Sequence, residues 1–131
     1  MSAARSEADK ASTVTPGRAR PAVAEAIRLP NGKIYSSPSV RGAAPDLHPD
    51  VQEILEAIPV LERGQGHGRC GLAVCVSQAL NDGFDPTGAR AAAVTVRNSV
   101  EHAKHGMVVG PCDSCVALED AFEMKFEGLN G

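Results

Sequence analysis

Two cysteines stand three positions apart in the segment Pro111-Cys112-Asp113-Ser114-Cys115. In the first turn of a helix, two thiolates at this spacing can hold one zinc ion between them. The positive potential of a helix N-terminus favours the thiolate form, and proline suits a helix opening because its missing N–H costs nothing there. A redox pair, a closed structural zinc site and two buried small side chains are the alternatives for this spacing.

A second candidate segment, His67-Gly68-Arg69-Cys70, precedes another expected helix. A third cysteine from this helix start would complete a three-ligand zinc site with one open position. An open position is what distinguishes a catalytic zinc from a structural one. Zinc-dependent deaminases take one ligand from one helix start and a Pro-Cys-x-x-Cys pair from the next.

Other side chains with ligand chemistry have less favourable positions. Cys75 follows Cys70 by five positions along the expected helix, a poor angle for sharing a metal, so we expect a buried small side chain. A closed site with four cysteines is the alternative. His102 and His105 could be ligands, but they stand in a polar connection and we expect them to be exposed to solvent. We expect His67 either to contact substrate or to cap the helix.

Hydrophobic spacing predicts the elements that position these residues. Residues 1–25 are rich in Ala, Ser, Thr, Pro and charge, so we expect a flexible N-terminal lead with patches of helix, followed by one domain over residues 26–131. Asn31-Gly32 favours a tight hairpin turn between two short strands. A mixed α/β layered domain fits the order of elements best. The expected elements are the hairpin 27–35, helices 49–58, 70–80 and 111–122, a strand 91–97 and a short strand 107–109.

Composition narrows the class of protein. The formal net charge of -3 is not that of a protein that grips nucleic acid by its phosphates. A local basic groove could still form. With aromatic residues at 3%, no set of stacking platforms for bases is evident. No apolar run approaches the ~18–20 residues of a membrane span, and the first residues contain no hydrophobic segment of the kind that a signal peptide has, so we expect a soluble chain in the cytoplasm. The basic residues that could line a groove are Arg63, Arg69, Arg97 and Lys104.

Over residues 27–124 the chain resembles the YwqJ-like deaminases, a bacterial branch of the cytidine-deaminase-like superfamily found in polymorphic toxins. The resemblance rests on 66–70 (Gly-His-Gly-Arg-Cys), on Pro111-Cys112-x-x-Cys115 and, more softly, on 29–35 and 47–49. It implies an α/β three-layer fold with a central mixed sheet flanked by helices, and Zn²⁺ held by Cys70, Cys112 and Cys115. It also implies a nucleobase, nucleotide or nucleic acid as substrate, a cognate immunity protein as partner and delivery by a secretion system.

The chain departs from the family at one position. The family's first motif reads Cys-x-Glu, with the glutamate as proton carrier, whereas this chain has Cys70-Gly71-Leu72. Leucine carries no proton, and a general acid/base contributes about 10²–10⁴ in rate. Three functions therefore stay open: a zinc-dependent hydrolytic deaminase, a catalytically dead deaminase-like zinc protein, and a closed four-cysteine interaction module. Nothing in the spacing favours a replacement for the glutamate among Glu62, Glu101 and Glu119.

Overall fold

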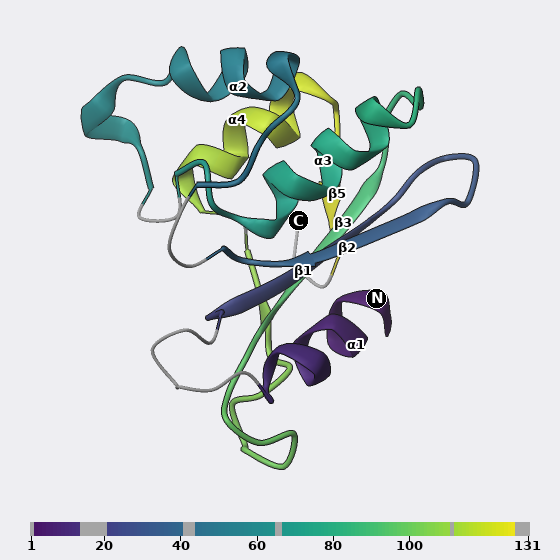
Figure 1. Ribbon diagram of the computed structural model, residues 1–131, viewed down its shortest axis with the longest axis vertical. Helices are drawn as coiled ribbons and strands as arrows, with labels where there is room; N and C mark the ends of the chain where they lie inside the picture. Colours follow the sequence, from purple (N-terminus) through teal and green to yellow (C-terminus); the bar gives the residue numbers. More distant parts are fainter. Residues whose placement is uncertain (1, 14–20, 41–43, 65–66, 111, 128–131) are drawn as a thin grey trace.

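The computed structural model describes residues 2–13, 21–40, 44–64, 67–110 and 112–127. Its centre is a sheet in the order β2-β1-β3-β4, with β5 also paired to β3 (Figure 1). The strands are β1 (Val23–Arg28), β2 (Ile34–Pro38), β3 (Arg90–Thr95), β4 (Val108–Val109) and β5 (Lys125–Phe126). The helices are α1 (Ser2–Ala11), α2 (Pro49–Glu56), α3 (Gly71–Asn81) and α4 (Asp113–Ala121), with a short 3₁₀ helix η2 (Val60–Glu62).

The first two strands form the predicted hairpin. They pair antiparallel, with Ile27 opposite Tyr35, and the turn closes where the Leu29 N–H donates to the Lys33 carbonyl at 2.8 Å. Gly32 has a φ of +90°, which an L side chain rarely adopts. The strand begins at Val23, earlier than expected, because Val23 and Ala24 continue its pairing with β3.

Helices cover both faces of this sheet. Helix α3 packs on β1 and β2, α2 and α4 pack together beyond it, and α1 lies on the opposite face (Figure 1). The α3 side holds the larger apolar side chains, including Ile27, Leu55 and Leu118. The sheet is mixed, since β3 pairs parallel with β5 and antiparallel with β1 and β4. The expected α/β fold with a mixed sheet between helices is confirmed.

The N-terminal lead differs from the expectation. Residues 2–11 form a helix whose Ala4 and Ala8 are fully buried against the sheet, so this part is packed rather than flexible. Small side chains at helical spacing allow a close approach between a helix and a sheet. Alanine gives a weaker apolar signal than Leu or Ile, so the pattern did not stand out in the sequence. No helix in the described ranges is both long and apolar enough to cross a membrane.

The segment after β3 also corrects an expectation. His105, expected to be exposed, is buried, and its Nε2 lies 2.8 Å from an Asp9 carboxylate oxygen on α1. His102 is exposed, as expected. The burial of His105 has a tertiary cause, since α1 covers the loop between β3 and β4 in addition to the sheet. Neither histidine belongs to a metal-type cluster among the described residues.

Candidate metal centre

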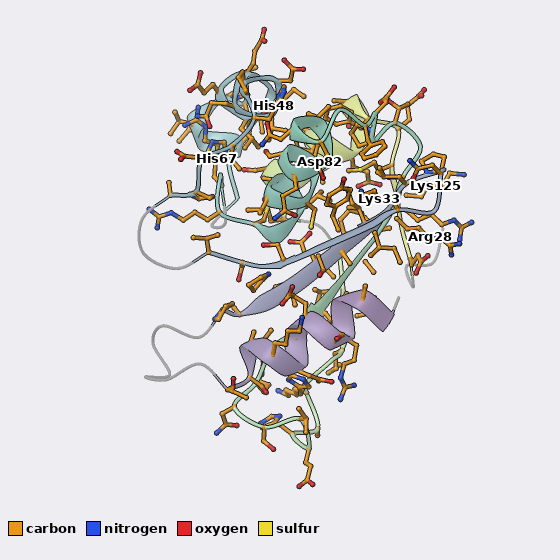
Figure 2. The ribbon with its side chains drawn as sticks, turned by 45° about the vertical axis from the view of Figure 1, so that its right-hand side comes forward. Arg28, Lys33, His48, His67, Asp82 and Lys125 are labelled. Atoms are coloured by element: carbon orange, nitrogen blue, oxygen red, sulfur yellow. A yellow bond between two sulfur atoms is a disulfide. The ribbon has the colours of Figure 1, made fainter. Side chains whose placement is uncertain are left out.

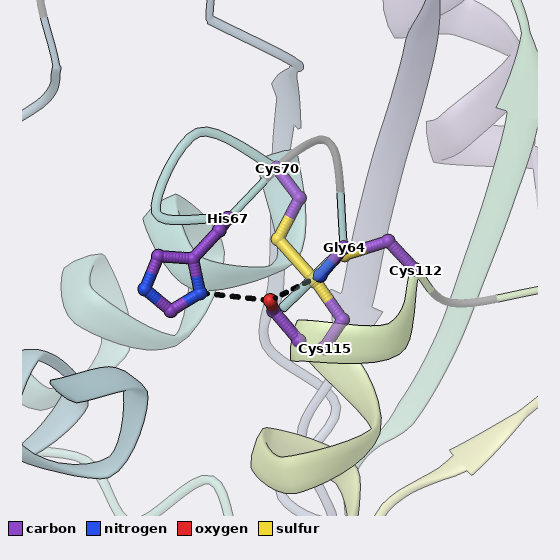
Figure 3. Close-up of a disulfide and its surroundings, with 6 residues drawn as sticks. Gly64, His67, Cys70, Cys112 and Cys115 are labelled. Carbon is purple, nitrogen blue, oxygen red and sulfur yellow. Dashed lines mark hydrogen bonds between the residues drawn. A yellow bond between two sulfur atoms is a disulfide. The ribbon is translucent and has the colours of Figure 1, made fainter. Parts of the chain in front are cut away.

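The three cysteines singled out by their spacing meet in the folded chain. The Sγ atoms of Cys70, Cys112 and Cys115 all lie within 4.8 Å of one another. Cys70 is the N-cap residue of α3, and Cys112 is the N-cap residue of α4, with Cys115 one turn further on. Two helix starts distant in sequence therefore bring their cysteine sulfurs together (Figure 3).

The geometry of these sulfurs fits a shared metal ion. The structure pairs Cys70 with Cys115 as a disulfide, and the Cys112 Sγ lies 3.3 Å from the Cys115 Sγ. The Cα atoms of Cys70 and Cys115 are 7.4 Å apart, beyond the range of about 4.4–6.8 Å usual for disulfides. A metal ion between the sulfurs accommodates the longer separation, and three thiolates suit zinc.

Burial also acts on the thiol of Cys112, the half-buried member of this cluster. Desolvation raises the pKa of the Cys112 thiol, and the N–H groups of Cys115 and Ser114 only partly oppose it. The negative charges of Glu25 and Asp113 raise this pKa further. The helix N-terminus therefore does not by itself favour the Cys112 thiolate, contrary to the expectation from the sequence. A divalent cation at the sulfurs would supply the missing positive charge.

A buried hydroxyl fixes the loop that leads to Cys70. The Ser114 Oγ accepts a hydrogen bond from the Gly64 N–H at 3.0 Å and lies 2.8 Å from the His67 Nδ1. Gly64 approaches α4 so closely that a Cβ there would lie 3.0 Å from the Asp113 nitrogen. The side chain of Ser114 thus ties this loop to the first turn of α4. Sequence spacing gave no sign of the Ser114–His67 pair because its members come from separate segments.

His67 is half-buried beside the cysteines (Figure 3) and does not cap α3. The N-cap residue of that helix is Cys70, and no side chain caps it. Desolvation and the positive charge of Arg63 lower the pKa of His67, which favours the neutral imidazole. If the Ser114 hydroxyl donates to Nδ1, the ring carries its proton on Nε2. Of the two expectations for His67, helix capping is therefore wrong.

Leu72, at the position where the resemblance implied a glutamate, is fully buried in the core. A different carboxyl group lies against the same helix start. Glu25 comes from the middle of β1, and its carboxylate accepts hydrogen bonds from the N–H groups of Leu72 and Gly71. Gly71 is required for this contact, because a Cβ there would overlap the Ser37 carbonyl oxygen and lie 3.2 Å from the Glu25 Cβ.

The environment of Glu25 is unusual for a carboxyl group. The residue is only 4% exposed, and burial raises its pKa to about 7 despite the two backbone hydrogen bonds. Its Oε2 has no hydrogen-bond partner among the described residues. Glu25 was not among the candidates expected from the sequence, although a glutamate between Ala24 and Ala26 in an apolar strand is itself a signal, since glutamate is rarely buried without a partner.

Cys75 lies outside the sulfur cluster. Its side chain is fully buried, as expected, and its thiol lies 3.9 Å from the backbone carbonyl oxygen of Glu25. Burial raises the pKa of this thiol. Among the described residues the cluster therefore has three cysteines, and the closed four-cysteine module loses its structural support.

The four basic residues considered for a groove do not come together, although Arg69 directly precedes Cys70 and the charge of Arg63 acts on His67. Arg97 and Lys104 belong to the segment between β3 and β4, which lies at the opposite end of the molecule from α2 in Figure 1. Figure 2 shows Arg28, Lys33 and Lys125 at the other side of the domain from His67. The basic groove considered from the sequence is therefore not formed as one surface.

The fold and the site together define a class: an α/β domain with three cysteine sulfurs at two helix starts, beside a buried carboxyl group. A model of the YwqJ-like deaminase family matches residues 7–124, and the chain belongs to this family. The match extends further toward the N-terminus than the resemblance seen in the sequence and includes part of α1. No curated protein and no solved structure gives a significant match.

Proposed function

We propose that this protein is a zinc-dependent hydrolytic deaminase acting on a nucleobase, nucleotide or nucleic acid. The observation that carries the proposal is the convergence of the Cys70, Cys112 and Cys115 sulfurs at two helix starts. Three protein ligands leave one position open, as in catalytic zinc sites. Zinc held there would supply the Lewis-acid activation of water that base deamination requires.

His67 is the proposed substrate-contacting residue. Its neutral imidazole stands beside the cysteines, with Nδ1 occupied by Ser114. Nε2 is then the atom left to donate a hydrogen bond to a carbonyl oxygen or ring nitrogen of a base. A neutral donor suits an uncharged base better than an imidazolium would, because no buried charge has to be compensated.

A groove beside the site bears on the class of substrate. It measures about 410 Å³, lies between α2 and α4, and includes the carboxyl-bearing side chains of Glu62, Asp113 and Asp120. These negative charges disfavour a phosphate backbone along this groove. A base would thus enter with its phosphates, if it has any, directed away from α4. The proposed biological setting is that of a toxin-type effector, with a cognate immunity protein as partner.

The second candidate is a deaminase-like zinc protein without catalysis, and Leu72 is the observation that favours it. An ammonia-release assay separates the two, using zinc-loaded protein and substrates that contain cytosine or adenine. Wild type and Cys75→Ser should release ammonia, whereas Cys112→Ser, which lacks a proposed ligand, should not. Zinc-loaded wild type that releases no ammonia from either base, free or in nucleic acid, would establish the second candidate instead.

A further inference from the structure

We propose that Glu25, reaching the site from β1, is the proton carrier of the hydrolysis in place of the glutamate that Leu72 displaces. This inference rests on the proposed function. Glu25 is not one of the glutamates that the sequence offered as replacements, and none of those lies in the core of the sheet. Glu62 and Glu101 are exposed, and Glu119 is only partly buried on α4.

The strand register directs the Glu25 side chain to the side of the sheet that α3 covers. Glu25 pairs with Ser37 of β2 on one side and Ala93 of β3 on the other, so it lies in the interior of the sheet. Val23 and Ile27 share its strand face and belong to the core on the α3 side. The glutamate therefore points to the layer that carries the cysteines rather than to α1.

The hydrogen bonds of Glu25 place its carboxylate at the first turn of α3. Its partners are the N–H groups of Leu72 and Gly71, which directly follow the proposed ligand Cys70. The carboxylate thus meets the backbone of the very position where the family's glutamate would stand. Its charge also acts on the Cys112 thiol of the neighbouring helix. Glu25 and the sulfurs therefore belong to one electrostatic environment.

A structural role accounts for only part of this arrangement. A single carboxylate oxygen of Glu25 would be enough to accept hydrogen bonds from the N–H groups at the start of α3. The other oxygen, Oε2, is buried with no hydrogen-bond partner among the described residues. A buried oxygen left unpaired costs about 1–3 kcal/mol. Such a cost is expected where the group serves chemistry, because active sites keep polar atoms free for substrate and water.

The proposed step balances with Oε2 as the only proton-carrying atom. Oε2 takes one proton from water as the water oxygen bonds to the amine-bearing ring carbon, and passes it to the ring nitrogen. It then takes the second proton, from the new hydroxyl group, and gives it to the exocyclic amine. The C–N bond breaks with its electron pair on nitrogen, and ammonia leaves as the ring carbonyl forms. Glu25 ends as the carboxylate it was at the start.

The test compares zinc-loaded wild type with Glu25→Gln, Glu25→Asp and the control Glu101→Gln. Gln keeps the accepting oxygen but carries no proton, so zinc content should stay at one per chain while ammonia release falls by about 10²–10⁴. Asp should retain more activity than Gln, because it keeps the carboxyl group. A purely structural cap predicts the reverse order, since Gln preserves the length of the side chain. Glu101→Gln should match wild type.

A second readout does not depend on turnover. In Co²⁺-loaded protein, the pH profile of the visible spectrum should shift in Glu25→Gln relative to wild type, because a carboxyl group beside the metal changes the local charge. Wild type that releases ammonia alongside an equally active Glu25→Gln overturns the inference and leaves the proposed function standing. An inactive wild type removes the proposed function and, with it, Glu25 as proton carrier. In that case, a pH profile of the cobalt spectrum that shifts in Glu25→Gln would still mean that the carboxyl group lies beside the metal. An unchanged profile would mean that it does not.

Discussion

The carboxylate of Glu25 accepts a hydrogen bond from the backbone N–H of Leu72. The position where the resemblance implied a catalytic glutamate is thus contacted by a glutamate from strand β1. The side chain of Leu72 fills the core, fully buried, and the acid enters the same helix start from the sheet. This relationship explains how a chain with leucine in the first motif can retain a carboxyl group near its cysteines.

The first prediction concerns the pH dependence of stability in the reduced, metal-free protein. The pKa of Glu25 is raised from 4.5 to about 7, so the folded state binds its proton more tightly than the unfolded state. Stability from this group is therefore fully present below about pH 4.5 and is lost as pH rises through about 7, by about 3 kcal/mol in all. Urea unfolding across this range should show the loss in wild type but not in Glu25→Gln. If the free energy of unfolding depended on pH in the same way in both proteins, the prediction would be wrong.

The second prediction concerns the close approach at Gly71. A Cβ at this position meets the Ser37 carbonyl oxygen and the Glu25 Cβ. Gly71→Ala should therefore lower the free energy of unfolding by about 1–3 kcal/mol, even though alanine is the better helix former. Chemical denaturation measures the change. An alanine variant as stable as wild type would mean that β2 and α3 separate without cost, and that Glu25 is less firmly placed than we infer.

The third prediction concerns the hydroxyl that joins the loop to α4. Ser114→Ala removes the acceptor of the Gly64 N–H and the partner of His67. Stability should fall by about 1–3 kcal/mol, because buried polar groups lose their partner. The control is Ser99→Ala, an exposed position. In wild type, NMR titration should show His67 protonating below 6.5, in keeping with its lowered pKa. A midpoint above that value would contradict the neutral imidazole.

The sequence predicted the local elements better than the tertiary contacts between them. Residues with strong local signals were identified: the Asn31-Gly32 turn and the helix starts at Cys70 and Cys112. Glu25 and His105 were not, because their roles arise from partners far along the chain. Glu25 contacts a helix that begins at Gly71, and His105 contacts Asp9 on α1. No local pattern encodes such pairings.

The fourth prediction tests whether α1 is an integral part of the domain. Ala8 is fully buried against small residues of the sheet such as Ala24 and Ala92. Ala8→Leu should lower the free energy of unfolding by about 1–3 kcal/mol through overpacking. The matched control is Lys10→Leu on the exposed side of the same helix. Equal stabilities for both variants would show that α1 detaches without consequence.

Cys70, Cys112 and Cys115, whose sulfurs lie within 4.8 Å of one another, are the proposed ligands of one zinc ion. Its most direct test is the metal content of reduced protein, measured for wild type, Cys112→Ser and Cys75→Ser. We predict one zinc per chain in wild type and in Cys75→Ser, and its loss in Cys112→Ser, because Cys75 lies outside the sulfur cluster. Wild type without zinc, or a Cys112→Ser variant that binds zinc as tightly as wild type, would rule out this zinc site.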